Sequence, residues 1–134
     1  VADQRVFQNT PEWTSSWRVN YSTPFKLINT DGDLTFVNSL SYRSDSAQFE
    51  ARMPLLDQDA YTLWDMSLVF KSEKGWTIGV HGKNLSDERY KVAGYNFVNQ
   101  TGPTTFVPTL GREGTLTAFY GDPRTWWVSL TNEF

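Results

Sequence analysis

The stretch that decides the fold is Tyr120–Phe134, which reads Tyr-Gly-Asp-Pro-Arg-Thr-Trp-Trp-Val-Ser-Leu-Thr-Asn-Glu-Phe. It opens with Gly121-Asp122-Pro123, a cluster that breaks regular secondary structure. Apolar and polar residues then alternate with a period of two, which is the pattern of a β-strand with two different faces. The apolar face carries Trp126, Val128, Leu130 and Phe134, and the polar face carries Trp127, Ser129, Thr131 and Glu133. The stretch therefore predicts a strand that ends in an aromatic residue.

The same alternation predicts four earlier strands. They cover approximately Trp13–Tyr21, Leu34–Ser44, Tyr61–Phe70 and Trp76–Asn84. The dipeptide Asp31-Gly32, which is typical of hairpins, predicts the turn between the first two strands. Residues 72–75 predict a tight turn before the fourth strand. The chain is therefore expected to be all-β and antiparallel, with about five strands.

The composition narrows the classes of protein. The chain has 134 residues, no cysteine and a net charge of -3, which exclude disulfides, a thiolate metal site and a basic surface for nucleic acid. No run of about 18 apolar residues is present to form a transmembrane helix. Aromatic residues make up 16% of the chain, although its mean hydropathy is only -0.49. This combination fits a transmembrane β-barrel, in which alternate residues face lipid, and it equally fits a soluble β-sandwich or lectin-like domain.

Two further patterns favour the barrel. The long predicted connections at residues 45–60 and 85–123 alternate with shorter ones, as in outer-membrane barrels whose short turns lie at one end. The polar faces also carry charged or titratable residues that a sandwich core would not accommodate. These are Arg18, Arg43, Asp65, His81, Lys83 and Glu133. His81, the single histidine, is expected to be a solvated wall position rather than a metal ligand.

Three stretches together resemble the C-terminal end of a TonB-dependent outer-membrane receptor. Residues 9–13, Asn-Thr-Pro-Glu-Trp, resemble the entry into a late barrel strand of that family. Residues 83–90, Lys-Asn-Leu-Ser-Asp-Glu-Arg-Tyr, resemble its segment after the penultimate strand, and residues 120–134 resemble its closing strand. Asn132 departs from the family pattern, which has an apolar residue at that position. Residues 84–90 are also interpreted as a turn in which side chains bond nearby backbone groups.

The resemblance implies that residues 1–134 are an antiparallel transmembrane β-barrel segment, the C-terminal part of a large plugged barrel. It implies a place in the bacterial outer membrane and energy-coupled uptake of a scarce nutrient. The expected small-molecule ligand is an iron–siderophore-type chelate. The plug domain and TonB box are absent from these residues. The expected partners are therefore outer-membrane lipid, the remaining barrel strands, the plug, and the TonB complex acting through the missing N-terminal part.

The connection at Lys91–Phe119 is expected to lie outside the cell in such a receptor. Together with its flank it carries residues able to stack on or pair with a ligand, namely Tyr95, Phe97, Phe106, Arg112 and Tyr120. The alternative is that these aromatic side chains only pack the loop. No nucleophile–base pair suggests catalysis, and no cofactor or metal ion is expected. For the whole chain, the alternatives are a soluble carbohydrate-binding or adhesive β-sandwich and an inactive truncated gene product.

Overall fold

The computed structural model describes residues 5–50, 53–100, 106–108 and 115–133, and these ranges contain eight β-strands and no helix. The prediction of an all-β, antiparallel fold is confirmed. The chain divides into two compact units. The large-sheet unit comprises Thr14–Tyr42, Thr62–Glu88 and Asp122–Phe134, and the small-sheet unit comprises Val1–Trp13, Arg43–Tyr61 and Arg89–Gly121. In the described ranges no helix is long and apolar enough to cross a membrane.

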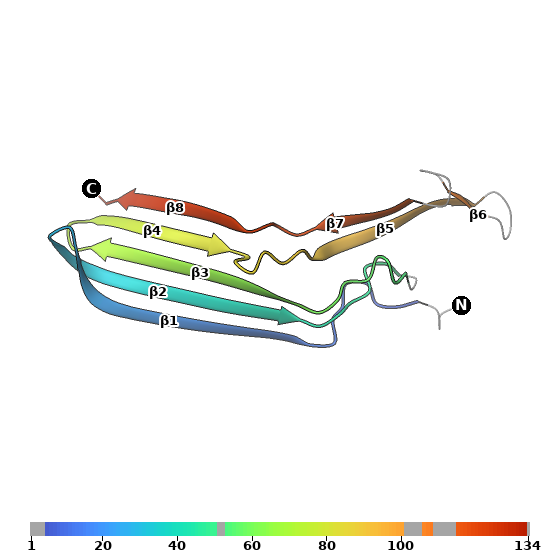
Figure 1. The fold of residues 1–134 in the computed structure, drawn as a ribbon, viewed down its shortest axis with the longest axis horizontal. Helices are drawn as coiled ribbons and strands as arrows, with labels where there is room; N and C mark the ends of the chain where they lie inside the picture. The colour runs from blue at the N-terminus through green and yellow to red at the C-terminus, as the bar shows by residue number, and fades with distance from the viewer. Residues whose placement is uncertain (1–4, 51–52, 101–105, 109–114, 134) are drawn as a thin grey trace. The chain divides into compact units, whose positions relative to one another are not determined.

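The large-sheet unit is built on a five-stranded sheet with the order β1-β2-β3-β4-β8 (Figure 1). Its strands are β1 (Thr14–Leu27), β2 (Thr30–Arg43), β3 (Tyr61–Ser72), β4 (Trp76–Lys83) and β8 (Thr125–Asn132). These are the five strands that alternation predicts, although β1 continues beyond the predicted end at Tyr21. The predicted closing residue, Phe134, lies outside the described residues.

The register divides the large sheet into two faces. Leu68, Val80 and Val128 are cross-strand partners on β3, β4 and β8. Partners directly opposite one another in antiparallel strands point to the same side of a sheet, so these residues share what we call the apolar face. Ile78 and Leu130 are a further pair on it. The apolar residues of these three strands therefore lie on one common face. The opposite, polar face carries Ser67, His81 and Trp127, which are partners in the same way.

Two side-chain hydrogen bonds extend these faces to β2 and β1. The indole nitrogen of Trp64 in β3 donates to Oδ1 of Asn38 in β2 at 2.6 Å, so both side chains lie on the apolar face. The hydroxyl oxygens of Ser22 in β1 and Thr35 in β2 are 3.0 Å apart on the polar face. Asn38 interrupts the apolar row of β2 in the sequence, and the structure gives it a hydrogen-bond partner within that row.

The turn between β1 and β2 lies at Ile28–Asn29, so the prediction of a turn centred on Asp31-Gly32 is wrong. Both turn residues have positive φ, 46° and 58°, as a two-residue type I′ hairpin requires. Gly32 instead lies inside β2, where a Cβ atom would collide with the ring of Phe70 and the backbone carbonyl of Lys71. The glycine is needed for this close approach between strands and not for the turn.

The small-sheet unit contains a three-stranded sheet with the order β6-β5-β7. Its strands are β5 (Lys91–Gln100), β6 (Phe106–Pro108) and β7 (Thr115–Tyr120). The long connection expected at residues 85–123 joins β4 to β8, and it contains this small sheet. Gly94 lies in β5 and allows the side chains of Leu56 and Gln48 to pack closely against this strand. A Cβ atom at Gly94 would stand 3.3 Å from Cβ of Leu56 and 3.2 Å from Cβ of Gln48. Both of these side chains are buried.

Few apolar side chains are buried in the part of the chain that the structure describes. The buried hydrophobic residues there are Leu56, Tyr61 and Phe70. Phe70 lies near the turn end of the large sheet, where its ring meets those of Phe25 and Trp76 at centroid distances of 6.3 and 5.3 Å. A soluble domain normally buries one contiguous apolar cluster. The described residues instead leave most of the apolar face of the large sheet exposed.

Candidate functional site

Of the five residues predicted to bind a ligand, Tyr95 and Phe97 lie together on β5. Their ring centroids are 6.3 Å apart, and the ring of Phe119 in β7 meets Tyr95 edge-on at 5.9 Å. The register pairs Tyr95 with Thr117 and Ala93 with Phe119, which places the three rings on one face of the small sheet. All three are exposed. We call them the aromatic surface. Phe119 is not among the predicted ligand-binding residues, because its place on this face depends on the pairing of β5 with β7.

The other three predicted residues do not join this surface. Tyr120 follows Phe119 along β7, so alternation turns it to the opposite side of the small sheet. The guanidinium carbon of Arg89 lies 5.4 Å from the centre of its ring, in a cation–π contact. Phe106 begins β6, but its side chain lies outside the described residues, as does the whole of Arg112. A ligand-binding role for the five residues stays a prediction.

Asn84 ties the segment after β4 to the segment before β8. Its side-chain nitrogen donates to the carbonyl oxygens of Glu88 and Asp122 at 2.9 and 3.0 Å. Its Oδ1 accepts from the backbone N–H of Glu88 at 2.9 Å, and its own N–H donates to Oδ1 of Asp65 at 2.9 Å. Asn84 is only 4% exposed and has a φ of 48°, which asparagine tolerates better than most residues. The interpretation of residues 84–90 as a turn held by side-chain-to-backbone bonds is confirmed.

A second contact joins the same two segments. Asp87 has a φ of 56°, and its Oδ1 accepts a long hydrogen bond of 3.4 Å from the backbone N–H of Arg124. The carboxylate and guanidinium groups of these residues also form an ion pair at 3.5 Å. Two of the stretches that carry the family resemblance, residues 83–90 and 120–134, are thus bonded to each other within the large-sheet unit. Their role in this structure is to fix where β8 begins.

His81 lies on the polar face, in β4. Its Nδ1 is 2.9 Å from Oγ of Ser67 in β3, and its Nε2 is 2.9 Å from Oγ of Ser129 in β8. The imidazole also stacks on the indole of Trp127 with ring centroids 4.9 Å apart. Gly79 makes room for this arrangement, because a Cβ atom there would stand 2.5 Å from Nε2 of His81 and 2.7 Å from Oγ of Ser129. The ring therefore acts as a polar bridge across three strands.

Beside this bridge the polar face has a hollow of about 260 Å³, which takes lining residues from all five strands of the large sheet. The lining includes Arg18, Ser39, Asp65, Ser67, Lys83 and Trp127. We call it the polar hollow. Nε of Arg18 donates to Oδ1 of Asn20 at 3.3 Å. The ion pairs found among the described residues involve neither Arg18 nor Lys83. Two cationic groups and one carboxylate give the hollow an excess of positive charge.

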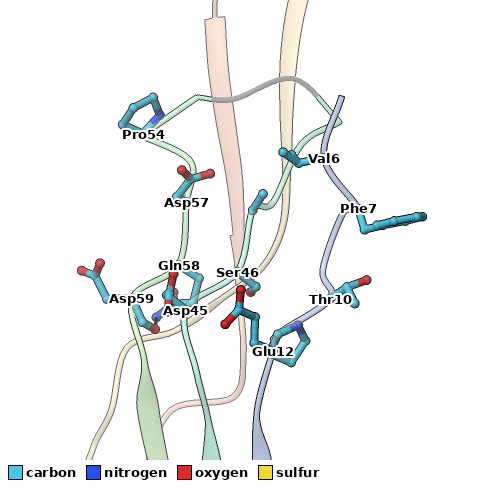
Figure 2. Close-up of a pocket in the computed structure, with 12 residues that line it drawn as sticks. Val6, Phe7, Thr10, Glu12, Asp45, Ser46, Pro54, Asp57, Gln58 and Asp59 are labelled. Carbon is cyan, nitrogen blue, oxygen red and sulfur yellow. Dashed lines mark hydrogen bonds between the residues drawn. The ribbon is translucent and has the colours of Figure 1, made fainter. Parts of the chain in front are cut away.

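A larger hollow of about 660 Å³ lies in the small-sheet unit (Figure 2). Its lining includes the carboxylates of Glu12, Asp45, Asp57 and Asp59 and no lysine or arginine. Oδ1 of Asp57 is buried and has no hydrogen-bond partner in the described chain. Across the described residues, no group of three or more His, Cys, Asp or Glu side chains is placed to hold a metal ion. We call this space the acidic hollow.

The polar hollow, the aromatic surface and the acidic hollow are the main sites that the described residues offer. The first lies in the large-sheet unit and the other two in the small-sheet unit. No family model, curated protein or solved structure matches the chain.

Proposed function

We propose that this chain forms part of the wall of a bacterial outer-membrane β-barrel, in a TonB-dependent receptor that takes up a scarce nutrient such as an iron–siderophore-type chelate. The observation that carries the proposal is the two-faced large sheet. One face presents an exposed apolar row, and the other presents serine, threonine, histidine and charged side chains. A barrel wall needs this division, because lipid lies on one side of each strand and an aqueous lumen on the other.

The apolar row is too exposed for a monomer in water. Trp17, Val128 and Leu130 are 72%, 66% and 74% exposed. Burying a side chain of this kind is worth roughly 1.5–3 kcal/mol, which a sheet left in water would forgo at each position. Lipid would cover the row without a second protein layer. Asn38 is compatible with that environment, because its Oδ1 already accepts from Trp64, and a hydrogen-bonded polar group costs less to desolvate.

The soluble β-sandwich is the second candidate. It would bind carbohydrate or act as an adhesin, and it requires a second sheet packed on the apolar face. Only Leu56, Tyr61 and Phe70 are buried hydrophobic residues in the described ranges, which does not support a packed layer there. The aromatic surface of Tyr95, Phe97 and Phe119 is the observation in its favour, since exposed rings can stack on sugars.

Two adjacent tryptophans on opposite faces provide the test. Trp126 pairs with Gly82 and Trp127 pairs with His81, so they point to opposite sides of β8. Two variants would keep one of these tryptophans each, with all others changed to phenylalanine. They would be refolded into phosphatidylcholine vesicles with brominated acyl chains, which quench indole fluorescence on contact. We expect strong quenching of Trp126 and weak quenching of Trp127. Strong quenching of both would contradict the wall proposal, because it would place both faces of β8 in lipid.

The assignment to a receptor has a separate test in the genome. A plug domain and further barrel strands encoded in frame upstream of Val1 would support it. A complete soluble domain encoded there, with no further alternating strands, would favour the sandwich.

A further inference from the structure

The cationic groups of the polar hollow have few partners. Arg18 uses only its Nε, in the bond to Asn20, and its two terminal amino groups have no hydrogen-bond partner among the described residues. Lys83, at the end of β4, likewise has no ion-pair or hydrogen-bond partner in that set. The one carboxylate of the hollow, Asp65, has its Oδ1 occupied by the N–H of Asn84. Two strong, unused donors of this face therefore border the same space.

The walls of the hollow are fixed by interactions that do not depend on a ligand. The serine–histidine–serine bridge joins β3, β4 and β8, and Trp127 is held against the imidazole of His81. Asp65 accepts from the backbone N–H of Asn84, whose side chain makes three further hydrogen bonds, two with Glu88 and one with Asp122. A site with a pre-formed wall loses less conformational entropy on binding than one that must order itself.

We propose that the polar hollow binds the oxyanion group of a small solute, a carboxylate or a phosphate, between Arg18 and Lys83. A guanidinium presents paired N–H donors that match two oxygens of such a group, and an ammonium adds a compact charge. The hydroxyl of Ser39 also lines this space and is a further donor. The carboxylate of Asp65 repels a second anionic group of the solute near β3. It also accepts a hydrogen bond from a hydroxyl or amine of the same solute.

The inference deepens the proposed function and rests on it in one respect, because it requires the polar face to be open to water. It adds that a solute in contact with the polar face carries a negatively charged oxyanion group. The site is distinct from the aromatic residues of the small sheet, and it uses only side chains of the large-sheet unit.

The test is a titration of the full chain, refolded in a nonionic detergent, with succinate and with inorganic phosphate, followed by calorimetry. The variant that keeps only Trp127 allows the same titration to be followed by fluorescence. We expect saturable binding that weakens about tenfold in Arg18→Gln and in Lys83→Gln, since each removes one charged donor. Lys71→Gln is the matched control. It removes the same charge from the polar face of β3, where Lys71 pairs with Thr77 outside the hollow, and it should leave affinity unchanged.

The outcomes separate the possibilities. Binding of succinate alone, of phosphate alone or of both assigns the oxyanion to one source or to either. Absence of saturable binding, or an equal loss in Lys71→Gln, overturns the inference. If Arg18→Gln does not fold, Arg18→Lys and Lys83→Gln still test it. Brominated-lipid quenching, measured in vesicles on the two single-tryptophan variants, tests the proposed function separately. Quenching without anion binding overturns only the oxyanion site, and loss of selective quenching overturns the wall proposal.

Discussion

At the residue scale, the side chain of Asn84 stabilises two segments of the chain through its hydrogen bonds to Glu88 and Asp122. Replacing it with alanine would leave the backbone groups of Glu88 and Asp122 without their partner and would force alanine into a left-handed conformation. We expect Asn84→Ala to lower the free energy of unfolding by about 2–4 kcal/mol. Ser86→Ala is the control, because Ser86 is exposed and its two hydrogen bonds, to the Thr62 carbonyl at 3.3 Å and to Oδ1 of Asn84 at 3.5 Å, are both long. Urea titrations in detergent would measure both, and equal losses would contradict the role of Asn84.

Gly79 and His81 provide a coupled pair at the same scale. A methyl group at Gly79 would displace the imidazole from Ser129, so Gly79→Ala should destabilise the sheet by about 1–3 kcal/mol. In a His81→Ala background the same change should cost much less, because the ring that it displaces is gone. The double-mutant cycle should therefore give a coupling of about 1–2 kcal/mol. Additive effects would show that the two residues act independently.

Arginine substitution distinguishes the two faces of β8. Near the middle of a bilayer, Leu130→Arg should cost about 2–4 kcal/mol, while the same change on the lumen side should cost far less. Thr131 is the better control, because the hydroxyl of its neighbour Ser129 already bonds His81. Thr131 is also exposed and pairs with Thr77 across the sheet. Refolding into vesicles would measure the difference, and equal losses for Leu130→Arg and Thr131→Arg would rule out a lipid-facing row.

At the scale of the element, the β1–β2 hairpin contains a local conflict. Ile28 is a β-branched residue with a φ of 46°, and its side chain is 87% exposed. The left-handed conformation of Ile28 therefore costs free energy at the turn, and no burial of its side chain offsets this cost. We expect Ile28→Asn to raise the free energy of unfolding by about 1 kcal/mol, because asparagine accepts the left-handed region. Ile28→Val keeps the β-branch and should give no gain. A loss of stability in Ile28→Asn would indicate that the exposed isoleucine has a packing role.

The hairpin also shows what the sequence could and could not predict. The turn dipeptide was placed at Asp31-Gly32, three residues beyond the observed turn at Ile28–Asn29. This displacement shifts the strand pairing by an even number of residues, so every side chain keeps its face and changes only its partner. Alternation along one strand therefore predicted the two faces correctly. The close approach of Gly32 in β2 to Phe70 in β3 is a contact between distant residues that no local pattern contains.

The candidate sites follow the same rule. Arg18, Asp65 and Lys83 were each predicted on a polar face, but their convergence on one hollow depends on the register of four strands. The small sheet was missed for a different reason. Ala93 and Gly94 weaken the alternation of β5. The two strands that flank β5 in the sheet, β6 and β7, both follow it in the chain. Phe119 could therefore be assigned to the aromatic surface only once β7 was paired.

At the scale of the whole molecule, the large sheet has two open edges. In the sheet order, β1 and β8 each have one neighbour among the described strands. Closing a barrel takes about eight strands, and an unpaired backbone group in hydrocarbon costs several kcal/mol. We expect the isolated chain to aggregate in plain buffer and to need detergent or further strands. Sedimentation with and without detergent would measure this. A monodisperse monomer with a cooperative melt in plain buffer would favour the sandwich instead.

The pairing of β8 with β4, rather than with its neighbour in the sequence, determines the order in which the sheet can form. The turn between β3 and β4 spans residues 73–75, whereas β4 and β8 are separated by residues 84–124. Closing a loop more than ten times longer costs about 2 kcal/mol of additional chain entropy. The hairpins β1–β2 and β3–β4 are therefore expected to form first, with β8 joining last. Until that step, Trp127 cannot stack on His81, so its fluorescence would report the completion of the sheet in time.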